Sequence, residues 1–491
     1  MKPLVSMRDA LADPELLGSV LSGQSWAPWR TLLIAIMGEA LDDEERAIFK
    51  ALTGRDGEPL ERVEEFWGVI GRRGGKSRAM AVLATYIGGL CDHSDDLTLG
   101  ERGVIPILSA TARQGAIVFG YVEALFDHIQ MLAPLVEGRT TDTLTLSNGV
   151  DVEVRPASWR TVRSMTAIAA IGDEAAFWRS DESANPDTEI LNALRPALAT
   201  TGGPLIVISS PYARKGEVYA TWKRHFGKSG DPLILVARAA SRALNPSLPQ
   251  RVVDRALERD HAAASAEYLA EFRTDVETLL TVESIDAVTI PNRRELPPQE
   301  GRKYYAFADP SGGSADSFTI GIAHVEGKTA VLDAIRERKP PFSPDAVTAE
   351  YAALLKSYFL KTVTADAYAL EWPRERWRAH GIECPVSKAS ASEIFGELLP
   401  LINSGRAELL DDPRLRSQLI ALERKTTRTG KDTISHPPGG HDDLAVAAAG
   451  ALRLAHKAAQ VRAVPIAMPI RVTGRRPSPE GTSHAGRAYI H

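Results

Sequence analysis

Cysteine is scarce in this chain, long apolar runs are missing, and neither sign of charge dominates. The 491 residues include only Cys91 and Cys384, whose separation gives no metal-ligand spacing and favours a reducing cytoplasm. No run approaches the ~20 apolar residues of a membrane span, and the N-terminal segment lacks the apolar core of a signal peptide. We therefore expect a soluble intracellular protein that has no membrane partner.

The charge balance gives no overall sign of a nucleic-acid partner. There are 58 Lys and Arg residues against 63 Asp and Glu residues, for a net charge of −5. Acidic metal ligands can mask a local basic groove, so this balance is only weak evidence against nucleic-acid binding. The length exceeds what one core usually supports, which indicates two or three domains.

The order of apolar patterns divides the chain. Residues 1–240 alternate strand-like and helix-like stretches, which predicts an α/β sheet, with a hairpin at Asn148-Gly149. Residues 241–300 are charged and then Pro-rich, typical of a small helical linker. From 301 to 460 a new domain begins with consecutive antiparallel strands, and 461–491 predicts a mobile tail rich in Pro, Gly and Arg.

A Gly-Arg-rich turn, GRRGGKS, resembles a phosphate-binding loop without its leading glycine, because Ile70 stands at that position. Such a loop needs backbone N–H groups at a helix N-terminus, a lysine for phosphates and a hydroxyl for Mg²⁺. The residues that match these needs are Gly74, Gly75, Lys76 and Ser77. The missing glycine should alter the start of the loop and leave its anion-binding groups in place.

An acidic pair follows an apolar run roughly 100 residues later. In IGDEAAF, Asp173 is placed to help hold Mg²⁺ and Glu174 to polarise the attacking water. A structural turn and a structural acidic pair are the plain alternatives for each motif alone. Both motifs in this order within one α/β stretch favour a nucleotide site.

Several residues around this site have two interpretations. Arg73, or its neighbour Arg72, is either solvated charge or an arginine finger, and Arg160 and Arg163 compete for that role. Ser209 and Ser210 end another strand, where a hydroxyl is placed to sense the phosphate. Trp29, with Gln24 and Trp26, is placed to stack an adenine, although core packing explains these aromatic residues equally well.

A second acidic set lies in the C-terminal part. Asp309 and Asp366 each end an apolar strand, and Asp442 and Asp443 precede an Ala-rich helix. An acid at a helix start is often only a cap. Three acids at element ends instead fit a two-metal phosphodiesterase centre that uses Mg²⁺ or Mn²⁺. Asp316 and His441 are candidates to support this set.

A basic stretch precedes the last acids. It predicts a hairpin whose tip reaches a phosphate backbone, and a solvated hairpin without a DNA contact is the alternative. Its cations are Arg424, Lys425, Arg428 and Lys431.

Taken in order, GRRGGKS, IGDEAAFW, FADPSGG and GHDD make the chain similar to the large terminase subunit of tailed bacteriophages, over nearly its whole length. The resemblance implies a P-loop (RecA/ASCE-like) ATPase domain followed by an RNase H-like nuclease domain. It implies ATP-driven packaging of double-stranded DNA into a procapsid and cutting of concatemers in the host bacterial cytoplasm. The implied partners are the portal protein, a small terminase subunit and further copies of the chain in a ring.

The resemblance also implies residue roles. Lys76 and Ser77 match the phosphate-loop pair, Asp173 the Mg²⁺ acid, Glu174 the catalytic glutamate and Ser209 the ATP-coupling motif. The implied nuclease acids are Asp309, Asp366 and one of Asp442 and Asp443, with Asp442 favoured. Ile70 and Val446 depart from the family pattern, and Val446 stands where many relatives place another acid.

Two other function classes fit the same motifs. A cellular DNA helicase-nuclease or transposition-type ATPase shares both chemistries, but usually carries helicase motifs or a DNA-binding module that this sequence does not display. A packaging motor with an inactive nuclease is the second alternative. Host, cutting mode (cos or headful) and ring stoichiometry are not encoded in any of these motifs.

Overall fold

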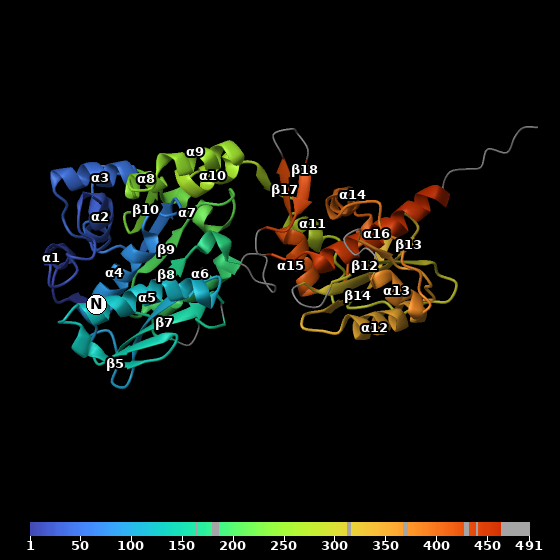
Figure 1. Ribbon diagram of the computed structural model, residues 1–491, viewed down its shortest axis with the longest axis horizontal. Helices are drawn as coiled ribbons and strands as arrows, with labels where there is room; N and C mark the ends of the chain where they lie inside the picture. Colours follow the sequence, from blue (N-terminus) through green and yellow to red (C-terminus); the bar gives the residue numbers. More distant parts are fainter. Residues whose placement is uncertain are drawn as a thin grey trace, which may run out of the picture.

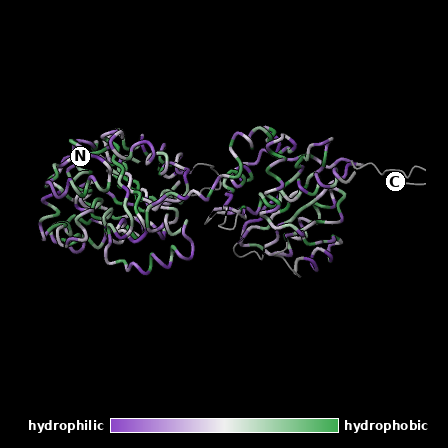
Figure 2. Tube along the Cα trace, turned by 90° about the horizontal axis from the view of Figure 1, so that it is seen from above, coloured by the Kyte–Doolittle hydropathy of each residue, from purple (hydrophilic) through white to green (hydrophobic). Residues whose placement is uncertain are grey.

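Two α/β units, one N-terminal and one C-terminal, lie next to each other along the long axis of the molecule (Figure 1). The structure is a computed structural model, and it describes residues 1–158, 160–162, 165–178, 186–311, 316–366, 372–426, 432–437 and 440–462. Hydrophobic residues are most frequent in the interior of each unit (Figure 2). Among the helices of these described ranges, none is long and apolar enough to cross a membrane.

An eight-stranded sheet forms the centre of the N-terminal unit, in the order β10-β2-β9-β8-β4-β7-β6-β5. The strands are β2 (Glu65–Ile70), β4 (Gly103–Ser109), β5 (Val136–Arg139), β6 (Thr143–Leu146), β7 (Val150–Pro156), β8 (Ala170–Asp173), β9 (Leu205–Ser209) and β10 (Ile234–Ala239). The six strands from β10 to β7 are parallel, and β6 and β5 extend the edge antiparallel, so the expected hairpin at Asn148-Gly149 is confirmed.

Helices cover both faces of this sheet, which is why its parallel strands are almost continuously apolar. The helices are α1 (Met7–Ala12), α2 (Ala27–Ile36), α3 (Asp43–Thr53), α4 (Lys76–Gly89), α5 (Ala112–His128), α6 (Pro186–Ala199) and α7 (Gly216–His225). One core cluster contains residues of α2, α4 and α5, and the other contains residues of α6 and α7. A short pair, β1 (Lys2–Pro3) with β3 (Cys91–Asp92), ties the N-terminal segment to the residues that follow α4.

The segment expected as a linker is mainly helical, but it divides between the two units. It contains α8 (Ser241–Leu244), α9 (Gln250–Arg259), α10 (His261–Leu269), β11 (Val276–Thr278) and α11 (Val282–Asp286). Leu244 belongs to the core of the N-terminal unit, whereas Leu280 and Ile285 belong to a core of the C-terminal unit. Each half of the segment therefore folds onto the unit that it adjoins.

The C-terminal unit has a five-stranded sheet in the order β15-β12-β13-β14-β16. The strands are β12 (Tyr304–Asp309), β13 (Phe318–Glu326), β14 (Thr329–Arg338), β15 (Thr364–Ala365) and β16 (Ala407–Glu408). The first three are consecutive and antiparallel, and β15 returns parallel to β12. Three consecutive antiparallel strands with a parallel strand at the β12 edge, together with the P-loop sheet, agree with the fold class expected from the sequence.

Small residues allow the last helix to approach this sheet closely. The helices of the unit are α12 (Pro344–Ser357), α13 (Trp372–Ala379), α14 (Ala391–Asn403), α15 (Pro413–Ala421) and α16 (Asp443–Arg462). A Cβ atom on Gly321 of β13 would lie 2.6 Å from the carbonyl oxygen of Ala447, and one on Gly450 would lie 2.3 Å from the Phe307 ring. This packing fixes the start of α16 at the end of β12.

A small three-stranded sheet lies where the two units meet (Figure 1). It consists of β11, β17 (Glu423–Thr426) and β18 (Asp432–Ser435), with β17 in the middle. The hairpin expected before the last acids is thus present as β17 and β18.

Candidate functional site

The turn between β2 and α4 has the backbone of an anion-binding loop. Gly75 caps α4 at φ 84°, and Arg73 has φ 65°. A Cβ atom on Gly75 would lie 3.0 Å from the Trp26 ring and 3.1 Å from the indole nitrogen of Trp29, so only glycine fits both the conformation and the space. The first N–H groups of a 14-residue helix therefore follow the turn, which is the arrangement that binds phosphate.

Side chains from distant segments hold this loop. The indole N–H of Trp29 donates to the carbonyl oxygen of Gly74 at 2.7 Å. From the other side, the Ser241 hydroxyl donates to the carbonyl of Arg72 at 2.6 Å, and the Asn245 amide donates to that of Arg73 at 2.9 Å. No sequence pattern pointed to Ser241 and Asn245, because they lie about 170 residues along the chain from their partners.

Lys76 connects the loop to the acidic strand. Its buried Nζ donates to the Ile70 carbonyl at 3.1 Å and to the Ser210 hydroxyl at 3.0 Å. The same Nζ lies 3.1 Å from Oε1 of Glu174. The loop lysine and the expected catalytic glutamate therefore form an ion pair.

Strand β9 lies between β2 and β8 and supplies the contacts between these two groups. The Ser210 backbone N–H donates to Oε2 of Glu174 at 2.9 Å, and the Ser209 hydroxyl donates to the same oxygen at 3.4 Å. The backbone of Glu174 has a left-handed conformation, with φ 50° and ψ 45°. Ser210, which the sequence places with Ser209 at the end of this strand, is the residue that contacts both Lys76 and Glu174.

Asp173 is the buried acid at the end of β8. Its pKa is raised to about 7, mainly by burial and also by the neighbouring Glu174 carboxylate, while Lys76 opposes both effects. A carboxylate with a pKa this high has little solvation to lose when it binds a cation. Ser77, the expected hydroxyl ligand, lies in the first turn of α4.

The arginines proposed as fingers differ in their surroundings. Arg72 pairs with Glu267 at 3.0 Å. Arg73 is exposed, and no carboxylate in the described ranges pairs with it. Arg160 is exposed and has an interaction partner. Arg163 lies outside the described residues.

Trp29 is placed differently from the expected stacking position. It is fully buried and packs beneath the loop, which leaves no ring face for an adenine. Trp26 is partly exposed, and the Arg78 guanidinium lies 5.1 Å from its ring centroid. Core packing, the alternative interpretation, therefore describes Trp29, and its polar contact explains why a tryptophan stands there.

In the C-terminal unit, three elements bring the second set of acids together. Ala308 of β12 pairs with Ala365 of β15, so Asp309 and Asp366 are the next residues on neighbouring parallel strands. On its other side, Asp309 pairs with Thr319 of β13, and the Thr319 hydroxyl donates to the Asp443 backbone carbonyl at 2.7 Å. This acidic corner, formed by Asp309, Asp366, Asp442 and Asp443, lies at one end of the sheet.

The carboxylates of the acidic corner affect one another. The pKa of Asp309 lies well above its ordinary value because the group is buried, and Asp443, Asp366 and Asp442 raise it further in that order. Burial raises the pKa of Asp443 to about 6, although nearby His441 lowers it. Within the described ranges, no three His, Cys, Asp or Glu side chains converge tightly enough to enclose a metal ion.

The two adjacent acids at the start of α16 are not equivalent. Asp443 raises the pKa of Asp309 more than Asp442 does. Asp442 instead accepts from the backbone N–H of His436 at 3.3 Å. The stronger electrostatic influence on Asp309 and the bond of Asp442 to the His436 backbone together favour Asp443 over Asp442 as the partner of Asp309.

The basic hairpin carries less free charge than its sequence suggests. Arg424 forms two hydrogen bonds with the Asp432 carboxylate across the hairpin, so its charge is already compensated. Lys425 lies 3.8 Å from Glu423. Arg428 and Lys431 are outside the described residues.

A buried carboxylate joins the two units at the base of this hairpin. The fully buried side chain of Glu423 accepts a hydrogen bond from the Tyr212 hydroxyl at 2.5 Å and lies 2.8 Å from Nζ of Lys215. Tyr212 and Lys215 belong to the loop that follows Ser209 and Ser210. The sequence contained no sign of this contact, because neither partner belongs to a motif.

Comparison with known proteins identifies similar structures. No family model matches the chain, and no curated protein does. The HK97 bacteriophage large terminase is 17% identical over 86% of this chain and 98% of its own, with a TM-score of 0.38. A large terminase from a thermophilic bacteriophage, solved in complex with ADP, is 13% identical over 78% of this chain and 92% of its own, with a TM-score of 0.35. The large terminase nuclease of thermophilic phage G20c with bound magnesium is 17% identical over 36% of this chain and 96% of its own, with a TM-score of 0.32.

The chain is thus similar to large terminase structures, the family that its sequence resembles.

Proposed function

We propose that the chain is a DNA-packaging motor subunit of the large terminase type, which hydrolyses ATP to move double-stranded DNA and cuts that DNA with a metal-dependent nuclease. The observation that carries the proposal is the contact of Lys76 with both Glu174 and Ser210 across three adjacent parallel strands. A structural turn has no need for a buried lysine beside a glutamate at the end of an acidic strand.

In the proposed motor, residues 1–240 hold ATP and Mg²⁺. The backbone of Gly74 and Gly75 and the ammonium of Lys76 bind the phosphates, while Ser77 and Asp173 provide oxygen ligands for the cation. Glu174 orients and polarises the attacking water, and Ser209 and Ser210 hold its carboxylate in position. When bound, Mg²⁺ supplies charge neutralisation at the phosphates.

In the proposed nuclease, residues 301–460 hold the divalent cations. Asp309, Asp366 and Asp443 are the candidate ligands, with Asp442 beside them. Burial first, and then the neighbouring carboxylates, raise the pKa values of Asp309 and Asp443, and a bound cation would relieve the repulsion between these groups. Bound Mg²⁺ or Mn²⁺ ions would activate water and stabilise the leaving oxygen of a phosphodiester. Hard cations of this kind require the carboxylate oxygens that this corner provides.

The proposed partners follow from the same function. They are double-stranded DNA, the portal protein of a procapsid, a small terminase subunit and further copies of the chain in an active ring. Arg73, exposed beside the loop, is the candidate arginine finger. The proposed setting is the cytoplasm of a bacterial host, with residues 461–491 as a tail.

Two assays test this proposal. Lys76→Ala should abolish ATP hydrolysis and leave Mn²⁺-dependent plasmid cleavage within about twofold, whereas Asp366→Ala should do the reverse, because the two sites lie in separate units. Stimulation of hydrolysis by purified procapsids distinguishes packaging from a cellular helicase-nuclease or transposition-type ATPase. A wild-type protein that hydrolyses ATP but never cuts DNA would indicate the inactive-nuclease alternative.

A further inference from the structure

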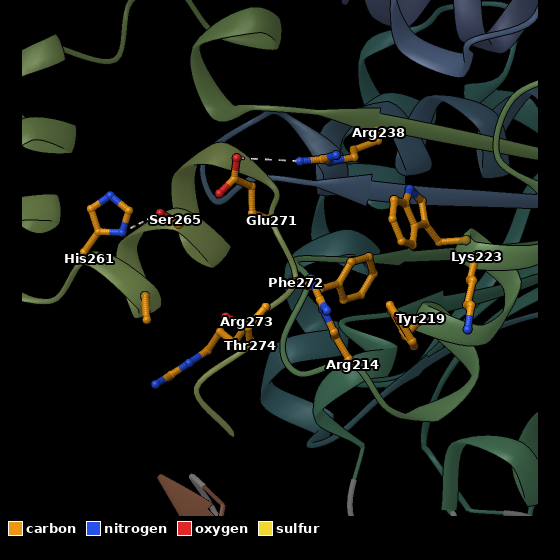
Figure 3. A pocket seen from close by; sticks show the side chains of 12 residues that line it. Arg214, Tyr219, Lys223, Arg238, His261, Ser265, Glu271, Phe272, Arg273 and Thr274 are labelled. Carbon is orange, nitrogen blue, oxygen red and sulfur yellow. Dashed lines mark hydrogen bonds and ion pairs between the residues drawn. The ribbon is translucent and has the colours of Figure 1, made fainter. Parts of the chain in front are cut away.

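A concave region of about 640 Å³ opens on the N-terminal unit, and none of the residues assigned to the two proposed catalytic sites lines it (Figure 3). Residues of α7, β10, α10 and the segment 271–274 line it. Its side chains are aromatic and basic, and neither the ATPase nor the nuclease assignment uses them. We call it the basic aromatic pocket.

Three aromatic rings form one wall. The rings of Tyr219 and Phe272 are 5.0 Å apart at an interplanar angle of 70°, and those of Trp222 and Phe272 are 5.1 Å apart at 43°. All three rings are only half-buried. In Figure 3 the Phe272 ring lies close to Tyr219 and Arg214. Packed rings of this kind are rigid and exclude water, which strengthens the interaction of nearby cations with an anion.

The cations around the wall outnumber the acids. Arg214 and Lys223 are exposed, and no carboxylate in the described ranges pairs with either of them. Arg238 lies 3.9 Å from Glu271, which is the only acidic side chain that lines the pocket among the described residues. Arg273 is held by two hydrogen bonds to Asp275.

Arg238, which has partners within the protein, differs in role from Arg214 and Lys223. Arg238 also donates to the Ala270 carbonyl at 2.7 Å, so it shapes the pocket rather than offering a free charge. Arg214 and Lys223, which pair with no carboxylate of the described residues, lie on opposite sides of Tyr219 (Figure 3). Two free cations beside a water-excluding wall form a site for phosphate, because Arg and Lys donate readily to phosphate oxygens.

We propose that the basic aromatic pocket binds the phosphate backbone of DNA through Arg214 and Lys223. The proposal rests on the proposed function, and it adds a DNA contact on the motor unit that is separate from the β17–β18 hairpin. Its position has a consequence for ATP hydrolysis. Arg214 lies four residues after Ser210, which contacts Glu174, so a phosphate bound at Arg214 is connected to the ATP site through one short loop.

The test is a double variant, Arg214→Ala/Lys223→Ala, compared with Lys328→Ala/Lys356→Ala, which removes two exposed lysines of the C-terminal unit. Fluorescence anisotropy with labelled double-stranded DNA over a series of salt concentrations measures the number of phosphate contacts. Removing Arg214 and Lys223 should reduce the salt slope by about two units and leave the control slope unchanged. It should also lower DNA-stimulated ATP hydrolysis severalfold without changing basal hydrolysis.

Free phosphates are the other source of the same chemistry, and a competition arm separates them. The fluorescence of Trp222 is obtained as the difference between the wild-type protein and Trp222→Phe. This fluorescence should change when the DNA duplex is added, and it should not change in a saturable way when ADP or pyrophosphate is added. A response to pyrophosphate alone, or an unchanged salt slope in a folded double variant, overturns the proposal. If the wild-type protein shows ATP hydrolysis and nuclease activity in that case, the proposed function stands and only the pocket assignment fails.

Discussion

The two acidic centres of this chain differ in how their charges are balanced. In the N-terminal unit, Glu174 contacts the buried ammonium of Lys76 and accepts two further hydrogen bonds from β9 and the residue that follows it. In the C-terminal unit, Asp309 is buried among other aspartates, each of which raises its pKa. The first centre is assembled by its own side chains, whereas the second has a surplus of negative charge that favours divalent cations.

The largest effect should come from the glutamate of the assembled centre. Glu174→Gln should lower ATP turnover about 10²–10⁴-fold, because the amide cannot polarise the attacking water. Nucleotide binding should persist, since Lys76 and the loop remain. Steady-state hydrolysis and equilibrium binding of a labelled nucleotide separate these effects.

The matched control is Glu189→Gln, an exposed glutamate on α6. Turnover in Glu174→Gln that stays within about twofold of this control would contradict the role of Glu174.

The next effect is on stability and depends on pH. The pKa of Asp173 is raised to about 7 in the folded chain, so the folded state binds this proton more tightly than the unfolded state does. The stabilising effect of protonation is therefore present below about pH 4 and is lost as the pH rises to about 7. The difference between a pKa of about 7 and the ordinary value corresponds to at most roughly 4 kcal/mol.

Asp173→Asn should accordingly raise the free energy of unfolding of the ligand-free protein at pH 8 and change it little at pH 4. Urea unfolding at pH 4, 6 and 8 measures the difference. With Mg²⁺ and ATP bound at pH 8, Asp173→Asn should instead be less stable than wild type, because the wild-type carboxylate then has the cation as a partner. A variant that is less stable than wild type at pH 8 without ligand would show that Asp173 is already compensated.

A third prediction distinguishes the two acids at the start of α16. Asp443→Ala should reduce Mn²⁺-dependent cleavage by at least about 10²-fold. Even mutation of a residue that only holds a metal ligand in place lowers metal affinity or activity by roughly 10–100-fold, and loss of a ligand itself should cost more. Asp442→Ala should cause a smaller loss, because Asp442 is directed toward the backbone of His436.

Plasmid cleavage at several Mn²⁺ concentrations provides the measurement, and Asp345→Ala, an exposed acid on α12, is the control. Both α16 variants should retain ATP hydrolysis. The opposite order of losses would restore Asp442 as the ligand favoured from the sequence.

The smallest effect concerns the contact between the units. Tyr212→Phe removes one hydrogen bond to the buried Glu423 carboxylate, which should cost about 1.5 kcal/mol, the lower end for a charged acceptor, because Lys215 remains paired. A double-mutant cycle with Glu423→Gln measures the coupling, with Tyr121→Phe on the exposed face of α5 as the control. A coupling energy of zero would mean that the two units touch there without stabilising each other.

Local patterns in the sequence predicted most of the fold and named the residues of the candidate sites. The glycines before Lys76 require a turn, the apolar run before Asp173 requires a buried strand, and the Ala-rich stretch after Asp443 requires a packed helix. Each of these requirements depends on residues that are near one another in the chain, so each can be read without knowing the fold.

Long-range pairing decided the rest. The insertion of β9 between β2 and β8 places Ser210 against both Lys76 and Glu174, and no spacing in the sequence encodes that neighbour. Trp29 is buried beneath the loop, and Arg424 is neutralised by Asp432, because packing and cross-strand pairing act on residues whose types alone suggested binding. The sequence by itself determined which chemical groups are available, and the tertiary structure decided which of them meet, because burial and contact depend on the order of the strands.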